Sequence, residues 1–290
     1  MKTFGAQSMS LPLRRVLMRR PDGPMRDADP AVWHYGAGFD AGRAAAQHAE
    51  LVRLVAASGA EVSFIDDRND GLADSVFVHD PSLVVDAGAV LLSMGKRLRL
   101  AEPGLHEKAF AGLGVPVIGR IDPPGLVEGG DCLFVDEDTL AVGMGVRTNR
   151  EGVRQLQIIL GRHGIDVIGY DLPLWTGEDA CLHLQSVISP LAPDLALVHA
   201  PLLPFAFFRL LKDIGVGLLV APEDEFAESL GLSLNVLATA PRRVIAVDGF
   251  PKTRRLMEEA GCVVSTFEAD ALCIACEGGP TCLTRPVLRA

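Results

Sequence analysis

The segment KTRRLMEEAGCVVSTF, residues 252–267, contains the pattern that decides the fold. An amphipathic helix is expected over Lys252–Ala260, and it is followed by Gly261 and the β-rich run CVVSTF. Glycine suits the left-handed position that ends a helix, and a run of apolar, β-branched residues is typical of a buried strand. The segment therefore predicts a helix, a tight turn and a strand.

Four earlier segments repeat this pattern. Helices are expected near Ala41–Ser58, His106–Leu113, Asn149–His163 and Phe205–Ile214, followed by Gly59, Gly114, Gly164 and Gly215. Successive glycines are 55, 50, 51 and 46 residues apart, and a period near fifty indicates a repeat architecture. The units could stack as an open doubly wound sheet or close into a ring.

Extra strands between the helices favour the ring. Leu133–Met144 and Arg242–Val247 both have the composition of strands, which gives several strands for each helix. The sequence therefore predicts an α/β fold built of five ββαβ units with pseudo-fivefold symmetry. Because no linker rich in Gly, Ser or Pro is present, residues 1–290 are expected to form a single domain.

The composition limits the partners of this 290-residue chain. Its net charge of −10 argues against nucleic acid and is compatible with a cationic small molecule. The most apolar stretch, Leu191–Leu211, contains three prolines and Asp194, so no membrane-spanning helix is expected. Six scattered cysteines and the absence of an apolar leader predict a cytoplasmic protein with reduced thiols.

Reactive residues recur at similar distances after the repeat glycines. Asp74 and Asp80 lie 15 and 21 residues after Gly59, Glu128 lies 14 after Gly114, His183 lies 19 after Gly164, and Cys282 lies 21 after Gly261. Taken singly, each residue also fits a core or turn position. Equivalent positions of a ring converge near its axis, however, so their common phase predicts a thiol nucleophile with an imidazole and acids around it.

Six motifs in this order resemble those of the dimethylarginine dimethylaminohydrolase and amidinotransferase group of the arginine-deiminase-like superfamily. They are DSVFVHDPSLV (Asp74–Val84), VEGGD (Val127–Asp131), GVRTNREGVRQL (Gly145–Leu156), LHLQS (Leu182–Ser186), GFPKTRRLMEEAG (Gly249–Gly261) and GGPTC (Gly278–Cys282). The resemblance covers nearly the whole chain and implies a five-bladed α/β propeller.

The resemblance also implies the roles of individual residues. Cys282 matches the nucleophile, His183 the catalytic histidine and Glu128 its acid. The substrate-binding positions are matched by Asp80 for the guanidinium, Asp74 for a further polar contact, Arg147 and Arg99 for the α-carboxylate, and Phe77. No metal and no cofactor is implied.

The expected reaction is hydrolysis of a guanidino C–N bond, in dimethylarginine or a related arginine derivative, through a covalent thiouronium on Cys282. The products are a ureido compound and an amine. Amidinotransferase and arginine deiminase activities are the alternatives, and a homodimer is left open. Two departures bear on the substrate: His79 stands where dimethylarginine hydrolases usually carry an acid, and Gln185 stands where deiminases carry Asp.

Two readings of other classes remain. Cys262, Cys273, Cys276 and Cys282 cluster in the sequence, and Cys273-x-x-Cys276 has a spacing used by zinc ligands. The second alternative is a catalytically inactive propeller that serves as a binding scaffold. The presence of Cys282, His183, Glu128 and Asp80 together argues against an inactive scaffold.

Overall fold

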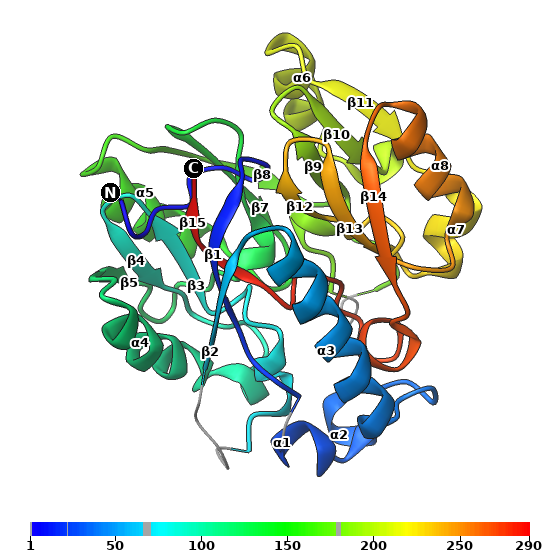
Figure 1. Cartoon of the computed structure of the whole chain (residues 1–290). Coiled ribbons are helices and arrows are strands. Elements are labelled where there is room, and N and C mark those ends of the chain that lie inside the picture. The colour runs from blue at the N-terminus through cyan, green and yellow to red at the C-terminus, as the bar shows by residue number, and fades with distance from the viewer. Residues whose placement is uncertain (1, 22, 66–70, 178–180) are drawn as a thin grey trace.

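The computed structural model describes residues 2–21, 23–65, 71–177 and 181–290 of the chain (Figure 1). The described strands form five three-stranded sheets. In each sheet the central strand has one antiparallel and one parallel neighbour. The sheets are β3 (Ser82–Val85), β4 (Gly88–Leu91) and β5 (Val117–Arg120); β6 (Cys132–Phe134), β7 (Thr139–Met144) and β8 (Asp166–Asp171); β9 (Ile188–Ala192), β10 (Leu195–Val198) and β11 (Gly217–Val220); β12 (Leu237–Ala240), β13 (Arg243–Val247) and β14 (Val263–Phe267); and β15 (Arg285–Arg289), β1 (Leu13–Met18) and β2 (Glu61–Phe64).

A long helix connects the two parallel strands of every sheet, which gives the order ββαβ. These helices are α3 (Ala41–Ala57), α4 (Glu102–Leu113), α5 (Arg150–Gly161), α6 (Phe205–Asp213) and α8 (Pro251–Glu259). They lie at the outside of the molecule, and the sheets face its centre (Figure 1). The predicted five-bladed α/β propeller is confirmed. The short helices α1 (Gly23–Arg26), α2 (Pro30–Trp33) and α7 (Glu223–Glu228) were not expected from the sequence.

The helices end and pack as the sequence pattern indicates. All five repeat glycines have positive φ, and Gly114, at φ 71°, caps α4. In α5, Val153, Leu156 and Leu160 are buried against apolar residues of β7 and β8. Their spacing of three and four residues places them on one helix face.

The fifth blade is assembled from both ends of the chain. β15 pairs antiparallel with β1, with Leu17 opposite Arg285 and Leu13 opposite Arg289. Nothing local in the sequence indicates this pairing, because 272 residues separate Leu13 from Arg285. As a consequence, Cys282 lies just before a strand that pairs with β1 and also packs against β3.

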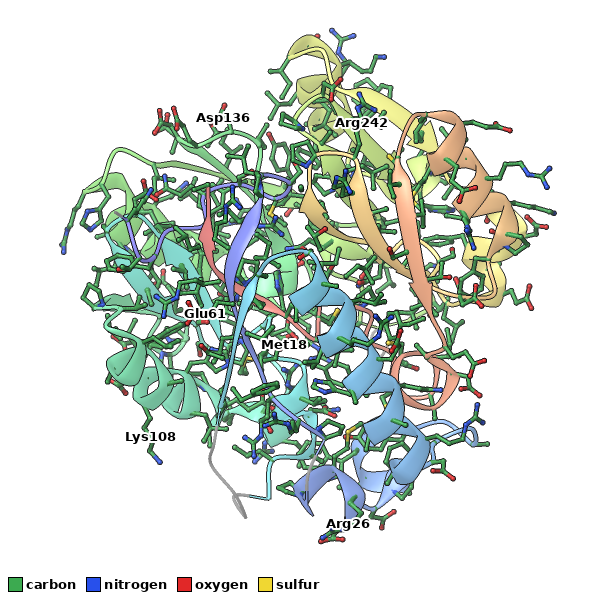
Figure 2. All side chains as sticks on the ribbon, viewed as in Figure 1. Met18, Arg26, Glu61, Lys108, Asp136 and Arg242 are labelled. Carbon is green, nitrogen blue, oxygen red and sulfur yellow. The ribbon has the colours of Figure 1, made fainter. Side chains whose placement is uncertain are left out.

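Charged side chains such as Arg26, Lys108 and Asp136 lie at the periphery, whereas Met18 is buried (Figure 2). Within the described part of the chain, the helices are too short or too polar to cross a lipid bilayer.

Candidate active site

Four predicted site residues occupy equivalent turns of four blades. Each lies two to five residues before the first strand of its sheet: Asp80 before β3, Glu128 before β6, His183 before β9 and Cys282 before β15. Hydrogen bonds join these turns across the blades. The Gly130 amide donates to Asp80 Oδ1 at 3.0 Å, and the His79 amide donates to the Cys282 carbonyl at 3.1 Å. The common phase seen in the sequence therefore corresponds to convergence in space.

Glu128 and His183 form the central pair. The His183 Nε2–H donates to Glu128 Oε2 at 2.9 Å, and the Glu128 side chain is completely buried. Burial alone raises the pKa of Glu128, but the hydrogen bond and charge of His183 lower it below its ordinary value. Burial likewise lowers the pKa of His183, and Cys181, Asp131 and Glu128 raise it well above the usual value. The pair is therefore a carboxylate and an imidazolium.

The glycines of the VEGGD motif allow this packing. Gly130 lies against the His183 ring, and a Cβ on it would come within 2.5 Å of His183 Nδ1. Gly278, in the turn that carries the nucleophile candidate, lies against the Phe77 ring so closely that a Cβ would overlap with it. Phe77 is buried there and supports the turn.

Asp80 is held by Arg99. Arg99 Nη1 donates to Asp80 Oδ2 at 2.7 Å, while Arg99 Nε and Nη2 contact Glu102 at 3.0 and 2.8 Å. Nη2 also donates to the Phe77 carbonyl, and Arg99 is 5% exposed. Burial alone raises the pKa of Asp80, and the charges of Arg99 and His183 lower it, so Asp80 is ionised. All three guanidinium nitrogens of Arg99 are engaged with the protein, which differs from the expected contact between Arg99 and a substrate carboxylate.

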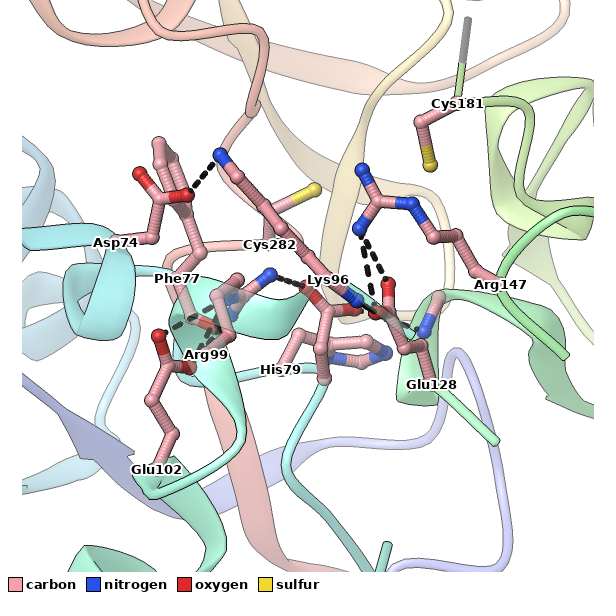
Figure 3. Close-up of polar contacts among 12 residues, drawn as sticks. Asp74, Phe77, His79, Lys96, Arg99, Glu102, Glu128, Arg147, Cys181 and Cys282 are labelled. Carbon is pink, nitrogen blue, oxygen red and sulfur yellow. Dashed lines mark hydrogen bonds and ion pairs between the residues drawn. The ribbon is translucent and has the colours of Figure 1, made fainter. Parts of the chain in front are cut away.

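Two cations lie closer to the surface of the site (Figure 3). Arg147 Nη1 contacts Glu128 Oε1 at 3.2 Å, and Lys96 Nζ contacts Asp74 Oδ2 at 2.6 Å. Asp74 also accepts a hydrogen bond from the Tyr35 hydroxyl at 2.9 Å. The side chains of Arg147 and Lys96 are 20% and 19% exposed, so both can reach a ligand in solvent. The sequence analysis did not single out Lys96 or Tyr35.

Cys282 is partly exposed and lies next to Asn235. Asn235 Nδ2 donates to Cys282 Sγ at 3.3 Å, and Asn235 Oδ1 accepts from the Thr281 amide at 3.0 Å. Burial and the Asp80 charge raise the pKa of Cys282, whereas the His183 charge and the Asn235 hydrogen bond lower it, and the net direction is upward. Without a cationic ligand, Cys282 is therefore a thiol.

Asn235 was missed, although the repeat contained its signal. It lies 20 residues after Gly215 and two residues before β12, which is the phase of the other four site residues. The turn of the remaining blade therefore also contributes a polar side chain to the site.

The two departures from the family pattern contact each other. His79 Nδ1 lies 2.9 Å from the Thr284 carbonyl and must donate to it, so Nε2 accepts from Gln185 Nε2 at 3.1 Å. Burial, with the charge of Arg285, lowers the pKa of His79 to about 3. The ring is neutral at physiological pH, and both side chains serve as buried, uncharged supports behind Asp80.

The structure does not bring the C-terminal cysteines together as a metal site. Cys262 packs in one apolar cluster, and Cys273 and Cys276 pack in another. Among the described residues, the ligand atoms that lie within 4.8 Å of one another belong to Glu128, His183 and Cys181. The Cys181 Sγ lies 3.4 Å from His183 Nε2, which is already hydrogen-bonded to Glu128.

The chain is similar in sequence and in fold to known proteins. A family model described as arginine deiminase matches residues 42–210. The chain is 31% identical over 280 residues to the N(G),N(G)-dimethylarginine dimethylaminohydrolase of Streptomyces coelicolor, covering 94% of this chain and 97% of that protein. A solved structure of the dimethylarginine dimethylaminohydrolase from Pseudomonas aeruginosa, a cysteine-to-serine mutant complexed with citrulline, superposes with a TM-score of 0.77 at 25% identity. It covers 96% of this chain and 100% of its own.

A more distant structure shares the fold. The amidinotransferase SxtG from Microseira wollei gives a TM-score of 0.79 at 17% identity and covers 99% of this chain and 97% of its own. Sequence and fold thus agree on one class, the guanidino-group-modifying α/β propellers. Within that class, the chain belongs to the arginine deiminase family, in the group that contains the dimethylarginine dimethylaminohydrolases.

Proposed function

We propose that this protein is a cysteine hydrolase that cleaves a C–N bond of a guanidino substrate, with Cys282 as nucleophile, His183 as acid and base, and Glu128 as the acid that orients His183. The substrate is dimethylarginine or a related arginine derivative. The observation that carries the proposal is the imidazolium of His183, which donates to Glu128 at 2.9 Å and whose charge acts on the Cys282 thiol. Such a residue can protonate a leaving amine at neutral pH.

The cationic substrate activates the nucleophile. Because Cys282 is a thiol when the site is empty, a guanidinium placed against Asp80 and Glu128 lowers the pKa of Cys282 and favours its thiolate. The sulfur adds to the guanidinium carbon, and the imidazolium of His183 gives its proton to the departing nitrogen. The amine leaves, and a thiouronium on Cys282 remains.

Water completes the reaction. Neutral His183 takes a proton from water, whose oxygen adds to the thiouronium carbon. The carbon–sulfur bond then breaks, the protonated urea so formed releases a proton to solvent, and the ureido product leaves. The cysteine is returned as a thiolate and His183 as an imidazolium, so the cycle needs no redox partner.

The remaining residues bind the substrate. Asp80 receives the guanidinium, with Phe77 beside it, and Asp74 adds a polar contact. Arg147 and Lys96, the partly exposed cations, are suited to the substrate's carboxylate because binding would release them from Glu128 and Asp74. We assign Arg99 to the positioning of Asp80, because its donors are directed to Asp80, Glu102 and Phe77.

The test is Cys282→Ser assayed for ureido product with methylated arginines, arginine, agmatine and short guanidino acids. We expect turnover to fall by more than about 10³-fold on every active substrate. Selective labelling of Cys282 by a haloacetamidine would support the assignment further. A Cys282→Ser enzyme with wild-type turnover would contradict it. Ureido product formed without added amine distinguishes the hydrolase from an amidinotransferase, which needs an acceptor.

Three further expectations belong to this proposal. Residues 1–290 act as one domain, the compartment is the cytoplasm, and the partner is a cationic small molecule. The six cysteines are all free, as expected in a reducing compartment. Light scattering after size exclusion would distinguish a monomer from a homodimer.

A further inference from the structure

A cavity of about 30 Å³ lies where the first strands of the five blades meet. We call it the axial cavity, and it is lined by residues that include Leu83 of β3, Phe134 of β6, Ser189 of β9, Ala238 of β12, and Arg285 and Arg289 of β15. Since one water needs roughly 10–15 Å³ of such space, the cavity has room for two or three water-sized particles. His79 and Gln185 form the wall toward the active site.

The two arginines enter the cavity from one strand. Arg285 and Arg289 are four residues apart on β15, so their side chains share one face of the strand. They are 3% and 6% exposed. Arg285 Nη2 donates to the His79 carbonyl, and Arg289 donates from Nη1 and Nη2 to the carbonyls of Leu11 and Ala238.

These contacts leave both guanidinium groups without a paired carboxylate. The Nε atoms of both arginines are buried and have no hydrogen-bond partner. Among the described residues, neither guanidinium forms an ion pair with a carboxylate, whereas Arg99 contacts two. Burial lowers the pKa of Arg285 to about 10 and that of Arg289 to about 9, and the charge of Arg285 contributes to the second shift. Both side chains are nevertheless cationic at neutral pH.

Buried cations need a counter-charge, and water supplies only a dipole. The lining offers no free acid: His79 is neutral and already donates to Thr284, and the Ser189 hydroxyl donates to the Leu234 carbonyl. Asp80 is the carboxylate whose negative charge acts on Arg285, and it is itself paired with Arg99. Partial compensation by Asp80 favours a single negative charge in the cavity, and the apolar walls disfavour a strongly hydrated divalent anion.

We propose that the axial cavity binds one small monovalent anion, for which chloride is the probe, through the Nε–H groups of Arg285 and Arg289. This anion site is separate from the guanidino site, and His79 and Gln185 lie between the two. Its size excludes bulky organic anions. The anion supplies the charge that no described carboxylate supplies, and it therefore stabilises the folded chain.

The first experiment compares thermal unfolding in sodium chloride and in sodium gluconate at constant ionic strength, because gluconate is too large for the cavity. We expect chloride to raise the Tm of the wild type by about 2–6 °C in a saturable way. Arg289→Met should lose this response. Arg242→Met is the matched control and should keep it, because Arg242 donates to a carbonyl but also has Asp194 as a carboxylate partner.

The second experiment is diffraction from wild-type crystals soaked in sodium bromide, which does not depend on a variant that folds. We expect an anomalous peak in the axial cavity within hydrogen-bond distance of Arg285 and Arg289 Nε. Coincident chloride and gluconate curves, a chloride response retained by Arg289→Met, or a cavity without bromide would each overturn the proposal.

Discussion

The active-site turns and the axial cavity lie on opposite sides of His79 and Gln185, and they treat buried charge in opposite ways. In the turns, the buried carboxylates of Glu128 and Asp80 each face a cation. Glu128 contacts His183, and Asp80 contacts Arg99. In the cavity, two arginines have carbonyl partners only. The comparison teaches that pairing prepares reactive groups for chemistry, whereas an unpaired buried charge indicates a place for a ligand.

The largest effect should come from breaking the central pair. Cys181, Asp131 and the hydrogen bond to Glu128 raise the pKa of His183, and Glu128→Gln removes the carboxylate of that hydrogen bond, so the pKa of His183 falls and the general acid is weakened. We expect kcat/KM to fall by about 10³-fold, with the alkaline limb of the pH–rate profile, which reports deprotonation of the general acid, displaced to lower pH. Steady-state kinetics from pH 5 to about 9 would measure both.

The matched control is Glu225→Gln, which changes another buried glutamate. Glu225 accepts from the Lys252 and Thr253 amides and lies outside the candidate site. Its substitution should affect stability and leave the pH–rate profile unchanged. An equal loss of activity in both variants would show that the Glu128 effect is structural.

The second substitution tests the pairing of Asp80. Arg99→Met leaves the buried carboxylates of Asp80 and Glu102 without their cation, and removal of one partner of a buried pair costs about 3–5 kcal/mol. Urea unfolding should show this loss of stability. Arg120→Met removes an exposed pair with Glu107 and should change stability by about 0.5 kcal/mol or less. Similar losses in the two variants would contradict the assigned role of Arg99.

The fold could be predicted because its signal is local and repeated. Each helix, glycine and strand lies within one short segment, and the common period linked five such segments. The pairing of β15 with β1 has no such signal, because it depends on closure between the chain ends. The distance from each repeat glycine predicted Asp80, Glu128, His183 and Cys282 as site residues. The same criterion applied to the fourth repeat would also have predicted Asn235.

Other features of the site could not be read from the sequence. An arginine bound to solvent or substrate and one buried between acids have the same local pattern, so the position of Arg99 between Asp80 and Glu102 required the structure. The contact between His79 and Gln185 joins residues that are 106 positions apart. Both residues were identified in the sequence as departures from the family pattern. Their contact with each other arises only when the turns pack together, so the sequence did not predict it.

A histidine of the site and a buried histidine on α4 differ in a related way. His183 faces acids and has a raised pKa, while burial and the charge of Arg285 lower the pKa of His106 to about 3. Below its ordinary value of 6.5, the unfolded chain protonates His106 and the folded chain does not. The free energy of unfolding should therefore decrease as the pH falls from about 6.5 toward 3, by about 1.4 kcal/mol per pH unit for this residue.

His106→Gln should remove that share of the slope, because glutamine does not titrate. Glutamine can still contact the Ser82 hydroxyl, which lies 2.9 Å from His106 Nδ1, so the local packing is kept. Urea unfolding at several pH values between 7 and about 4.5 would measure it. The exposed His163 provides the control, and His163→Gln should leave the slope unchanged. Identical slopes for His106→Gln and the wild type would show that the His106 ring is protonated in both states.

The smallest effect concerns the contact between Asn235 and Cys282. Asn235→Ala removes the N–H that stabilises the thiolate, so the pKa of Cys282 should rise by about one unit and alkylation at pH 7 should slow about tenfold. Asn235→Asp distinguishes this effect from loss of turn support. Its carboxylate still accepts from the Thr281 amide but brings a negative charge to the sulfur, so the pKa should rise further than with alanine. The order Asn, Ala, Asp in the midpoint of the pH–alkylation curve would support direct electrostatic control of the thiol. An aspartate variant that behaves like the wild type would show that Asn235 acts only by supporting the Thr281 turn.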